Sequence, residues 1–196
     1  MMSTIVLAQS ADTGLRTVAQ YSARLSYIFM CFTLTWGVLT ATNWVRNITG
    51  RKALRGSHMV MATLTLAFGG IHAMAFLFLS SGALSLAYLT VPYFVSGALA
   101  RHVLGVVGFE LMLAIALTAG LYRFTSYRRW LYLHRIAYLA VPITAIHSFF
   151  GAIANGNLAL DWLVGTILLV PVLTLTALRF LPTRALERIG LIEEQV

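Results

Sequence analysis

Four of the chain's five histidines, a residue type that binds metals, form two pairs of nearly equal spacing. His58 and His72 are 14 residues apart, and His134 and His147 are 13 apart, each pair within one apolar stretch. In a helix, a rise of 1.5 Å per residue separates the members of each pair by roughly 20 Å. Ionisable residues inside apolar helices are rare and usually functional. Imidazole is a ligand for transition metals and for haem iron.

The composition indicates that these helices lie in a membrane. Of the 196 residues, 59% are hydrophobic and 10% are charged, whereas a soluble domain carries about a quarter of charged residues. The net charge of +8 does not indicate nucleic acid as a partner, because the basic residues lie in short loops between apolar runs. We therefore expect one all-α, polytopic helix bundle with lipid as its partner, in a cell membrane such as a bacterial inner or plasma membrane.

Five segments have the roughly 20 apolar residues that a spanning helix needs. They are residues 24–44, 57–79, 102–122, 130–152 and 161–180. The segment 80–101 is apolar too, but Gly82, Pro92 and Gly97 interrupt it. We expect a loop there with a short interfacial or re-entrant piece, and a sixth span is the alternative.

The basic residues predict the orientation of these spans, because Lys and Arg are enriched in cytoplasmic loops. Eleven of the fourteen lie on one side if there are five spans: Arg46, Arg51, Lys52, Arg55, Arg123, Arg128, Arg129, Arg135, Arg179, Arg184 and Arg188. The N-terminal segment 1–23 is then external, 24–180 is the transmembrane domain, and 181–196 is a cytoplasmic tail. A sixth span would break this pattern.

With five spans, the two histidine-bearing helices run in the same direction. His58 can then face His134 near the cytoplasm, and His72 can face His147 near the exterior. Each pair could hold one haem non-covalently, since a lone Cys31 excludes a C-x-x-C-H attachment site. A metal-only site is less favoured because ligands roughly 20 Å apart cannot share an ion. Hydrogen-bonded or interfacial histidines are the other reading.

The helical phase of the second pair does not fit an ideal helix. At 100° per residue, 14 residues bring His72 to within about 40° of the face of His58, whereas 13 residues leave His147 about 140° from that of His134. Pro142 lies between them and could realign the second ligand, or it could be an ordinary kink. Gly69 and Gly70, just before His72, could let a porphyrin approach or could serve helix packing.

These motifs resemble the ferric reductase-like transmembrane domain of ferric reductases and NADPH oxidases, and also the haem subunit of the bacterial periplasmic methionine sulfoxide reductase system. The resemblance covers roughly residues 22–180. It centres on R-R-W-L-Y-L-H-R-I-A-Y-L-A at 128–140 with the later His147. It continues in R-K-A-L-R-G-S-H at 51–58 and G-G-I-H at 69–72.

The resemblance implies two haem b groups, one bound by His58 with His134 and one by His72 with His147. It also places Arg24 near the outer haem. Large family members continue into a cytosolic flavin and NAD(P)H domain, for which residues 181–196 leave no room. We therefore expect the haem-carrying electron-transfer subunit of an oxidoreductase. Its flavin would lie only on a separate cytosolic reductase, or quinol would be the donor, and its electron acceptor would be external.

Other polar residues are secondary candidates. Arg55 and Arg135 neighbour the inner ligands and could pair with haem propionates, or could only set topology; Arg24 could equally be an interfacial arginine. Glu110 lies near the middle of its span and could be neutral, bonded across the bundle or part of a proton path. Residues that could line the outer mouth or cover it are Arg101, His102, Tyr88, Tyr93 and Phe94.

Two other functions remain open at this point. A quinol-linked cytochrome b subunit of a larger dehydrogenase uses similar helix pairs and spacings. A non-redox membrane protein, such as a transporter or an assembly factor, would carry these histidines incidentally.

Overall fold

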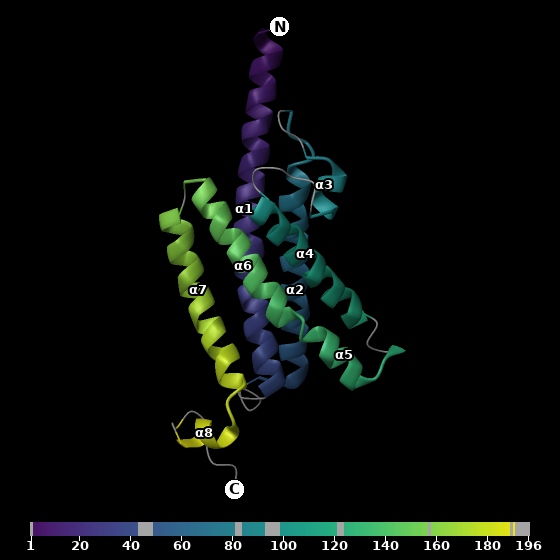
Figure 1. Ribbon diagram of the computed structural model, residues 1–196, viewed down its shortest axis with the longest axis vertical. Coiled ribbons are helices and arrows are strands. Elements are labelled where there is room, and N and C mark those ends of the chain that lie inside the picture. The colour runs from purple at the N-terminus through teal and green to yellow at the C-terminus, as the bar shows by residue number, and fades with distance from the viewer. Residues whose placement is uncertain are drawn as a thin grey trace.

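The computed structural model describes residues 2–42, 49–80, 84–92, 99–120, 124–156, 158–188 and 190, which form helices and no strand (Figure 1). The helices are α1 (Met2–Thr42), α2 (Arg51–Ala75), α3 (Leu86–Thr90), α4 (Leu99–Gly120), α5 (Tyr127–His134), α6 (Ala137–Ala154), α7 (Leu158–Arg179) and α8 (Thr183–Arg188). The predicted all-α architecture is confirmed for this part of the chain.

Four of the described segments are long and apolar enough to cross a bilayer. They are Gln9–Thr42, Arg51–Ala75, Ala100–Gly120 and Tyr127–Ala154, the last of which contains α5 and α6. They correspond to the first four predicted spans, so the chain is a multi-pass membrane protein. Helix α7 corresponds to the fifth predicted span, but its apolar part, Leu163–Arg179, is shorter than the other four. A fifth crossing and the orientation of the termini therefore stay predictions.

Helix α1 begins much earlier than the hydropathy indicates. It is continuous from Met2, whereas the apolar stretch begins near Arg24. No proline interrupts residues 2–23, so nothing in the backbone chemistry ends the helix where the hydropathy falls. Hydropathy marks the part of a helix suited to lipid, not the helix terminus.

The apolar segment between α2 and α4 contains only a short helix among its described residues. Helix α3 has five residues, and its N-cap Ser85 accepts a hydrogen bond from the backbone N–H of Tyr88. Five residues rise about 7.5 Å, far less than a bilayer requires. The described part thus agrees with the predicted loop, while 81–83 and 93–98 lie outside the described residues.

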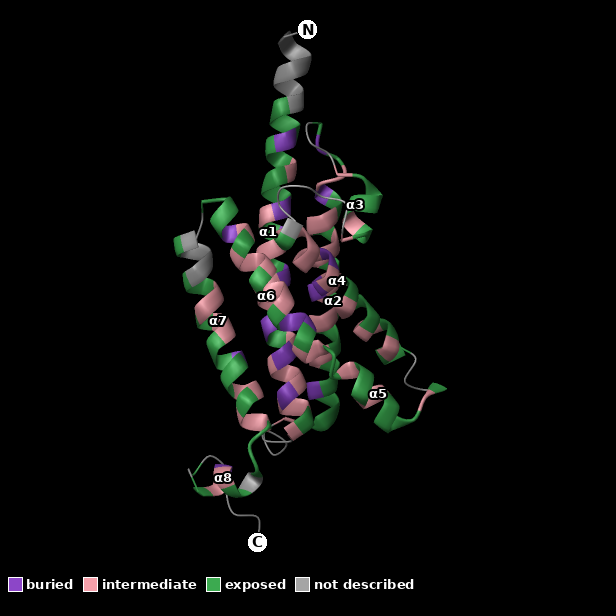
Figure 2. Cartoon of the chain, in the orientation of Figure 1, coloured by how far each residue is buried: buried purple, intermediate pink, exposed green. Residues whose placement is uncertain are grey.

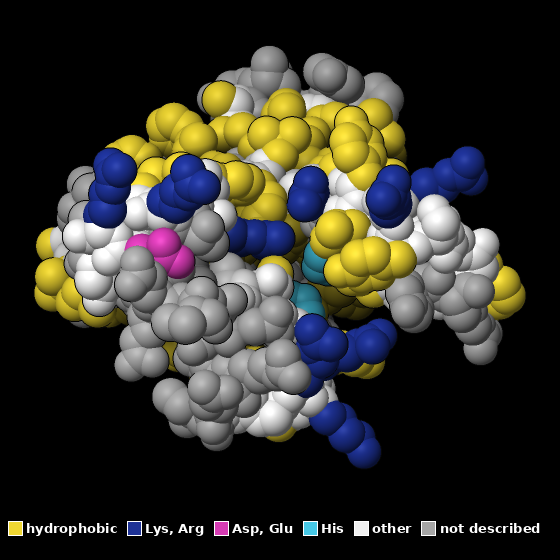
Figure 3. All heavy atoms as spheres, turned by 90° about the horizontal axis from the view of Figure 1, so that it is seen from below, with side chains coloured by type: hydrophobic (Ala, Val, Ile, Leu, Met, Phe, Trp, Pro, Cys, Tyr) yellow, Lys and Arg dark blue, Asp and Glu magenta, His cyan; other side chains and the backbone are white. Residues whose placement is uncertain are grey.

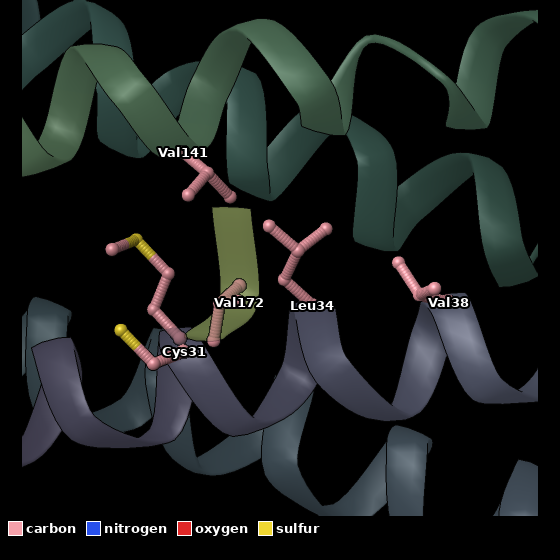
Figure 4. Packing of buried hydrophobic residues seen from close by; sticks show 6 residues of the cluster. Cys31, Leu34, Val38, Val141 and Val172 are labelled. Carbon is pink, nitrogen blue, oxygen red and sulfur yellow. The ribbon is translucent and has the colours of Figure 1, made fainter. Parts of the chain in front are cut away.

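Helix α1 is at the centre of the bundle and carries most of the core. It packs against α2 along its length and also contacts α6 and α7. Its buried face meets one side chain each from α6 and α7 (Figure 4). The cluster consists of Met30, Cys31, Leu34, Val38, Val141 and Val172. Burial of this strip against α6 and α7 fixes the position of α1, against which the histidine-bearing helix α2 lies.

The outward faces of the helices are exposed and largely apolar, in contrast to the buried strip on α1 (Figure 2). Val60 on α2, Leu117 on α4 and Ile167 on α7 each expose more than half of their surface. A soluble monomer rarely exposes so much contiguous apolar surface. These faces are therefore the surface that contacts lipid.

Candidate functional site

Two pairs of histidine rings face each other across the bundle. His58 on α2 and His134 at the end of α5 have ring centroids 5.9 Å apart, with their planes 70° from parallel. His72 on α2 and His147 on α6 have centroids 6.2 Å apart, with planes at 72°. We call these the 58–134 site and the 72–147 site. The pairing shows that α2 runs in the same direction as α5 and α6, as the sequence predicted.

Backbone carbonyls on neighbouring helices hold three of the four rings. The Nδ1 atom of His58 lies 2.9 Å from the carbonyl of Thr33, and that of His72 lies 2.8 Å from the carbonyl of Ala19. The Nδ1 atom of His147 lies 2.8 Å from the carbonyl of Arg101 on α4. Because a carbonyl only accepts, each Nδ1 is the donor, which leaves Nε2 of the neutral ring with a free lone pair.

The ring separations fit two imidazoles on opposite sides of one metal ion. An imidazole nitrogen binds a first-row metal at about 2.0–2.1 Å, so two opposed rings have centroids roughly 6.3 Å apart. The observed 5.9 and 6.2 Å agree with that value. No cluster of three or more His, Cys, Asp or Glu occurs among the residues searched, which are those the structure describes. Each site therefore brings together two histidine rings that could bind one metal ion.

The two carbonyls on α1 repeat the spacing of the two histidines on α2. Ala19 and Thr33 are 14 residues apart, as are His58 and His72. The antiparallel helices are also joined between these points, because the Ser26 hydroxyl donates to the Thr65 carbonyl at 2.9 Å. Interhelical hydrogen bonds in membranes contribute only about 0.6 kcal/mol each on average. Their main effect here is to fix the register that sets both ring orientations.

A break in the fourth span resolves the phase mismatch of its two histidines. Helix α5 ends at His134, residues 135 and 136 form a turn, and α6 begins at Ala137. The turn contains i→i−3 bonds, such as the Ile136 N–H to the Leu133 carbonyl. Helix α6 continues through Pro142. The turn thus changes the helical phase directly after the first ligand, which the sequence did not indicate, and a contribution from Pro142 stays a prediction.

Glycines on the facing helices make room for two of the rings. A Cβ atom at Gly105 on α4 would lie 2.6 Å from the His147 ring, and one at Gly37 on α1 would lie 3.2 Å from the His58 ring. A Cβ atom at Gly69 would instead meet the side chain of Phe109 at 3.1 Å. Gly69 therefore serves helix packing. Sequence reasoning missed Gly37 and Gly105 because they are far from the histidines in the chain.

The three arginine candidates do not share one environment. Arg55 and Arg135 are exposed, and each is within a turn of a ring of the 58–134 site. Arg24 is half-buried, with its guanidinium 5.8 Å from the centroid of the Tyr21 ring. Their proposed contacts with haem stay predictions.

Arg179 is a residue that the sequence assigned only to topology. Its guanidinium donates to the Tyr138 hydroxyl and lies over that ring, 5.5 Å from the centroid. The guanidinium also lies within electrostatic range of the His134 ring, although both would be cations if that ring were protonated. A cation from α7 is therefore part of the surroundings of the 58–134 site. Because Arg179 and His134 are far apart in the sequence, their proximity could not be predicted from it.

The face seen from below is basic and is hollowed around histidine. Figure 3 shows histidine side chains in a depression with Lys and Arg side chains around it. A shallow hollow of about 430 Å³ on α5 is lined by Arg128, Arg129, Tyr132 and Leu133. Positive charge and access to a histidine thus occur on one face of the molecule.

At the opposite end of the bundle, His102 is tied to the loop before α4. Its Nε2 atom donates to the Tyr88 carbonyl, so this ring joins α4 to α3. Arg101 contributes its backbone carbonyl to His147. Tyr88 is exposed on α3, while Tyr93 and Phe94, which the sequence grouped with it as a lid, lie outside the described residues.

Glu110 faces outward from α4, near the middle of that helix. The opposite face of α4 carries Gly105 and Gly108, which contact the side chains of His147 and Thr144. The interaction across the bundle that the sequence allowed for Glu110 is not made with any residue that the structure describes. Glu110 therefore lies apart from both histidine sites.

We predict that Glu110→Gln leaves both sites intact, because the side chain points away from all four rings. The haem content of purified protein and its reduced-minus-oxidised spectrum should match wild type. Gly108→Val is the matched comparison on the inward face, where an added Cβ would lie 2.5 Å from the Thr144 hydroxyl. A Glu110→Gln protein with altered haem bands would contradict this placement.

Comparison with known families agrees with the geometry. The family described as "Ferric reductase like transmembrane component" matches residues 22–145, which is more than half of the chain. The chain belongs to the ferric reductase-like transmembrane family. Comparisons with curated proteins and with solved structures gave no significant match.

The family match covers most of the candidate site of this ferric reductase-like protein. It runs from α1 into α6 and includes His58, His72 and His134, and it ends two residues before His147. Ferric reductase-like domains generally bind haem, and their family is one of transmembrane electron transfer. The opposed rings and free Nε2 atoms described above are a donor set that fits this cofactor.

Proposed function

We propose that this chain carries electrons across a membrane through two b-type haems. His58 and His134 would bind the inner haem, and His72 and His147 the outer one. The observation that carries the proposal is the separation of the paired rings, 5.9 and 6.2 Å, in a protein of a haem-binding family. When bound, the haems would supply one-electron redox chemistry, one at each histidine pair.

The protein's own part is to orient and insulate these centres. The carbonyls of Thr33, Ala19 and Arg101 each accept from Nδ1–H of one imidazole, which fixes the ring orientation and leaves Nε2 as the atom that would bind iron. The buried strip on α1 keeps water out of the bundle beside them. Arg55 and Arg135 would balance inner haem propionates, and Arg24 would do so at the outer site.

The basic face that exposes histidine supports entry of electrons from the cytoplasm. Lys and Arg concentrate on that side of the predicted topology, and they would also attract an acidic donor protein. We propose a separate cytosolic flavin reductase as the donor and an external acceptor such as a ferric chelate. The protein would then be the haem subunit of an oxidoreductase in a bacterial cell membrane.

The test is reduction across a sealed vesicle. Purified protein is reconstituted into proteoliposomes that contain ferricyanide, and a membrane-impermeant reduced flavin is added outside. We expect ferricyanide to be consumed only in vesicles that contain the protein. Consumption with a lipid-soluble quinol but not with flavin would favour the quinol-linked alternative, and absence of haem from the purified protein would refute the proposal.

A further inference from the structure

His134 differs from the other three rings in what holds it. His58, His72 and His147 each donate Nδ1–H to a backbone carbonyl of a neighbouring helix. The Nδ1 atom of His134 is buried and has no hydrogen-bond partner among the residues that the structure describes. A ring without that bond can rotate about its Cβ–Cγ bond unless something else restrains it.

Trp130 contacts the His134 ring face to face. Their centroids are 4.9 Å apart and their planes are within 18° of parallel. The two residues are four apart on α5, so they lie one above the other on one face of the helix. The indole is half-buried, and offset stacking of this kind has a preferred geometry.

The stack and the missing hydrogen bond occur at the same ring. Helix α5 ends at His134, and the turn at residues 135 and 136 follows at once. The other ligand of the fourth span, His147, lies well inside α6 and reaches the Arg101 carbonyl on α4. At the end of α5, the Trp130 ring from the preceding turn contacts the His134 ring, where the other three ligands have a hydrogen bond from Nδ1.

We propose that Trp130 is a positioning residue that fixes the plane of the His134 ring by stacking. This inference rests on the proposed function, because it concerns His134 as an axial ligand of the inner haem. The stack predicts a specific effect on the angle between the two ligand planes.

That angle can be measured by electron paramagnetic resonance of the oxidised protein. In low-spin ferric haem with two imidazoles, the largest g value depends on the angle between the imidazole planes. The planes are far from parallel at both sites, 70° and 72°. Rotation of the His134 ring would therefore move and broaden the signal of the inner haem and leave that of the outer haem in place.

The experiment compares Trp130→Leu and Trp130→Phe with a matched aromatic at the other site. Phe76 lies four residues after His72, with centroids 5.3 Å apart, but the Ala19 carbonyl holds that ring. We expect Trp130→Leu to shift and broaden the inner signal, Trp130→Phe to restore it, and Phe76→Leu to change neither signal. Trp130→Met replaces the leucine variant if that protein does not accumulate.

Three results would overturn the proposal. The first is a wild-type inner signal in Trp130→Leu or Trp130→Met at full haem content. The second is an equal shift from Phe76→Leu at the outer site, which would show a general packing effect. The third is a Trp130→Phe signal displaced as far as that of the leucine variant. A wild-type protein without haem would refute the proposed function itself, whereas normal haem bands with unchanged g values would refute only the role of Trp130.

Discussion

The Gly105→Ala variant should retain one haem per chain instead of two. Its Cβ would lie 2.6 Å from the His147 ring, closer than real Cβ contacts allow, so the ring must move. Movement would break the bond from Nδ1 to the Arg101 carbonyl and take Nε2 away from the axial position. The pyridine haemochrome yield per protein should fall by about half, with loss of the bands of the 72–147 site.

Gly151→Ala is the control for this variant. Gly151 lies four residues after His147 on α6, and an added Cβ there would meet nothing within 4 Å. That protein should keep both haems, and its thermal stability should be similar to that of the wild type. If Gly105→Ala also kept two haems, the His147 ring would not occupy the position beside α4 that the structure gives it.

The His58→Ala variant should abolish transmembrane reduction while retaining one haem. It removes one ligand of the 58–134 site together with the bond to Thr33 that helps to hold α2 against α1. The 72–147 site lies roughly 20 Å away along α2 and keeps both of its ligands. Ferricyanide consumption in the vesicle assay should fall to the level of protein-free vesicles, a larger loss than the halved haem content.

Met59→Ala is the matched change on the neighbouring outward face. Met59 exposes 59% of its surface, and no ring contact joins it to either histidine pair in the described structure. Both haem content and the rate of ferricyanide consumption should stay near wild type. A His58→Ala protein that still reduced ferricyanide at the wild-type rate would mean that electrons do not pass through the 58–134 site.

The pairing of the histidines could be predicted because it depends on regular features of the chain. Helical rise sets the depth of each residue, and the bias of Lys and Arg sets the direction of the spans. Together they placed His58 opposite His134 and His72 opposite His147, as the structure does. The four long apolar helices followed from hydropathy in the same way.

The finer parts of the site could not be predicted because they depend on contacts between distant segments. Backbone carbonyls carry no sequence signal, so nothing indicated that Thr33, Ala19 and Arg101 would hold the rings. The turn at residues 135 and 136 contains neither glycine nor proline. The change in helical phase was therefore predicted at Pro142, the proline of this span, although α6 continues through it.

Haem stoichiometry, measured for the wild type and for each of the four His→Ala variants, tests the central claim most directly. Two haems per wild-type chain are predicted, with His58→Ala and His134→Ala losing one and the same haem, and His72→Ala and His147→Ala losing the other. The reduced-minus-oxidised spectra identify which haem remains. A wild-type chain with one haem, or variants from different pairs that lose the same haem, would contradict the account.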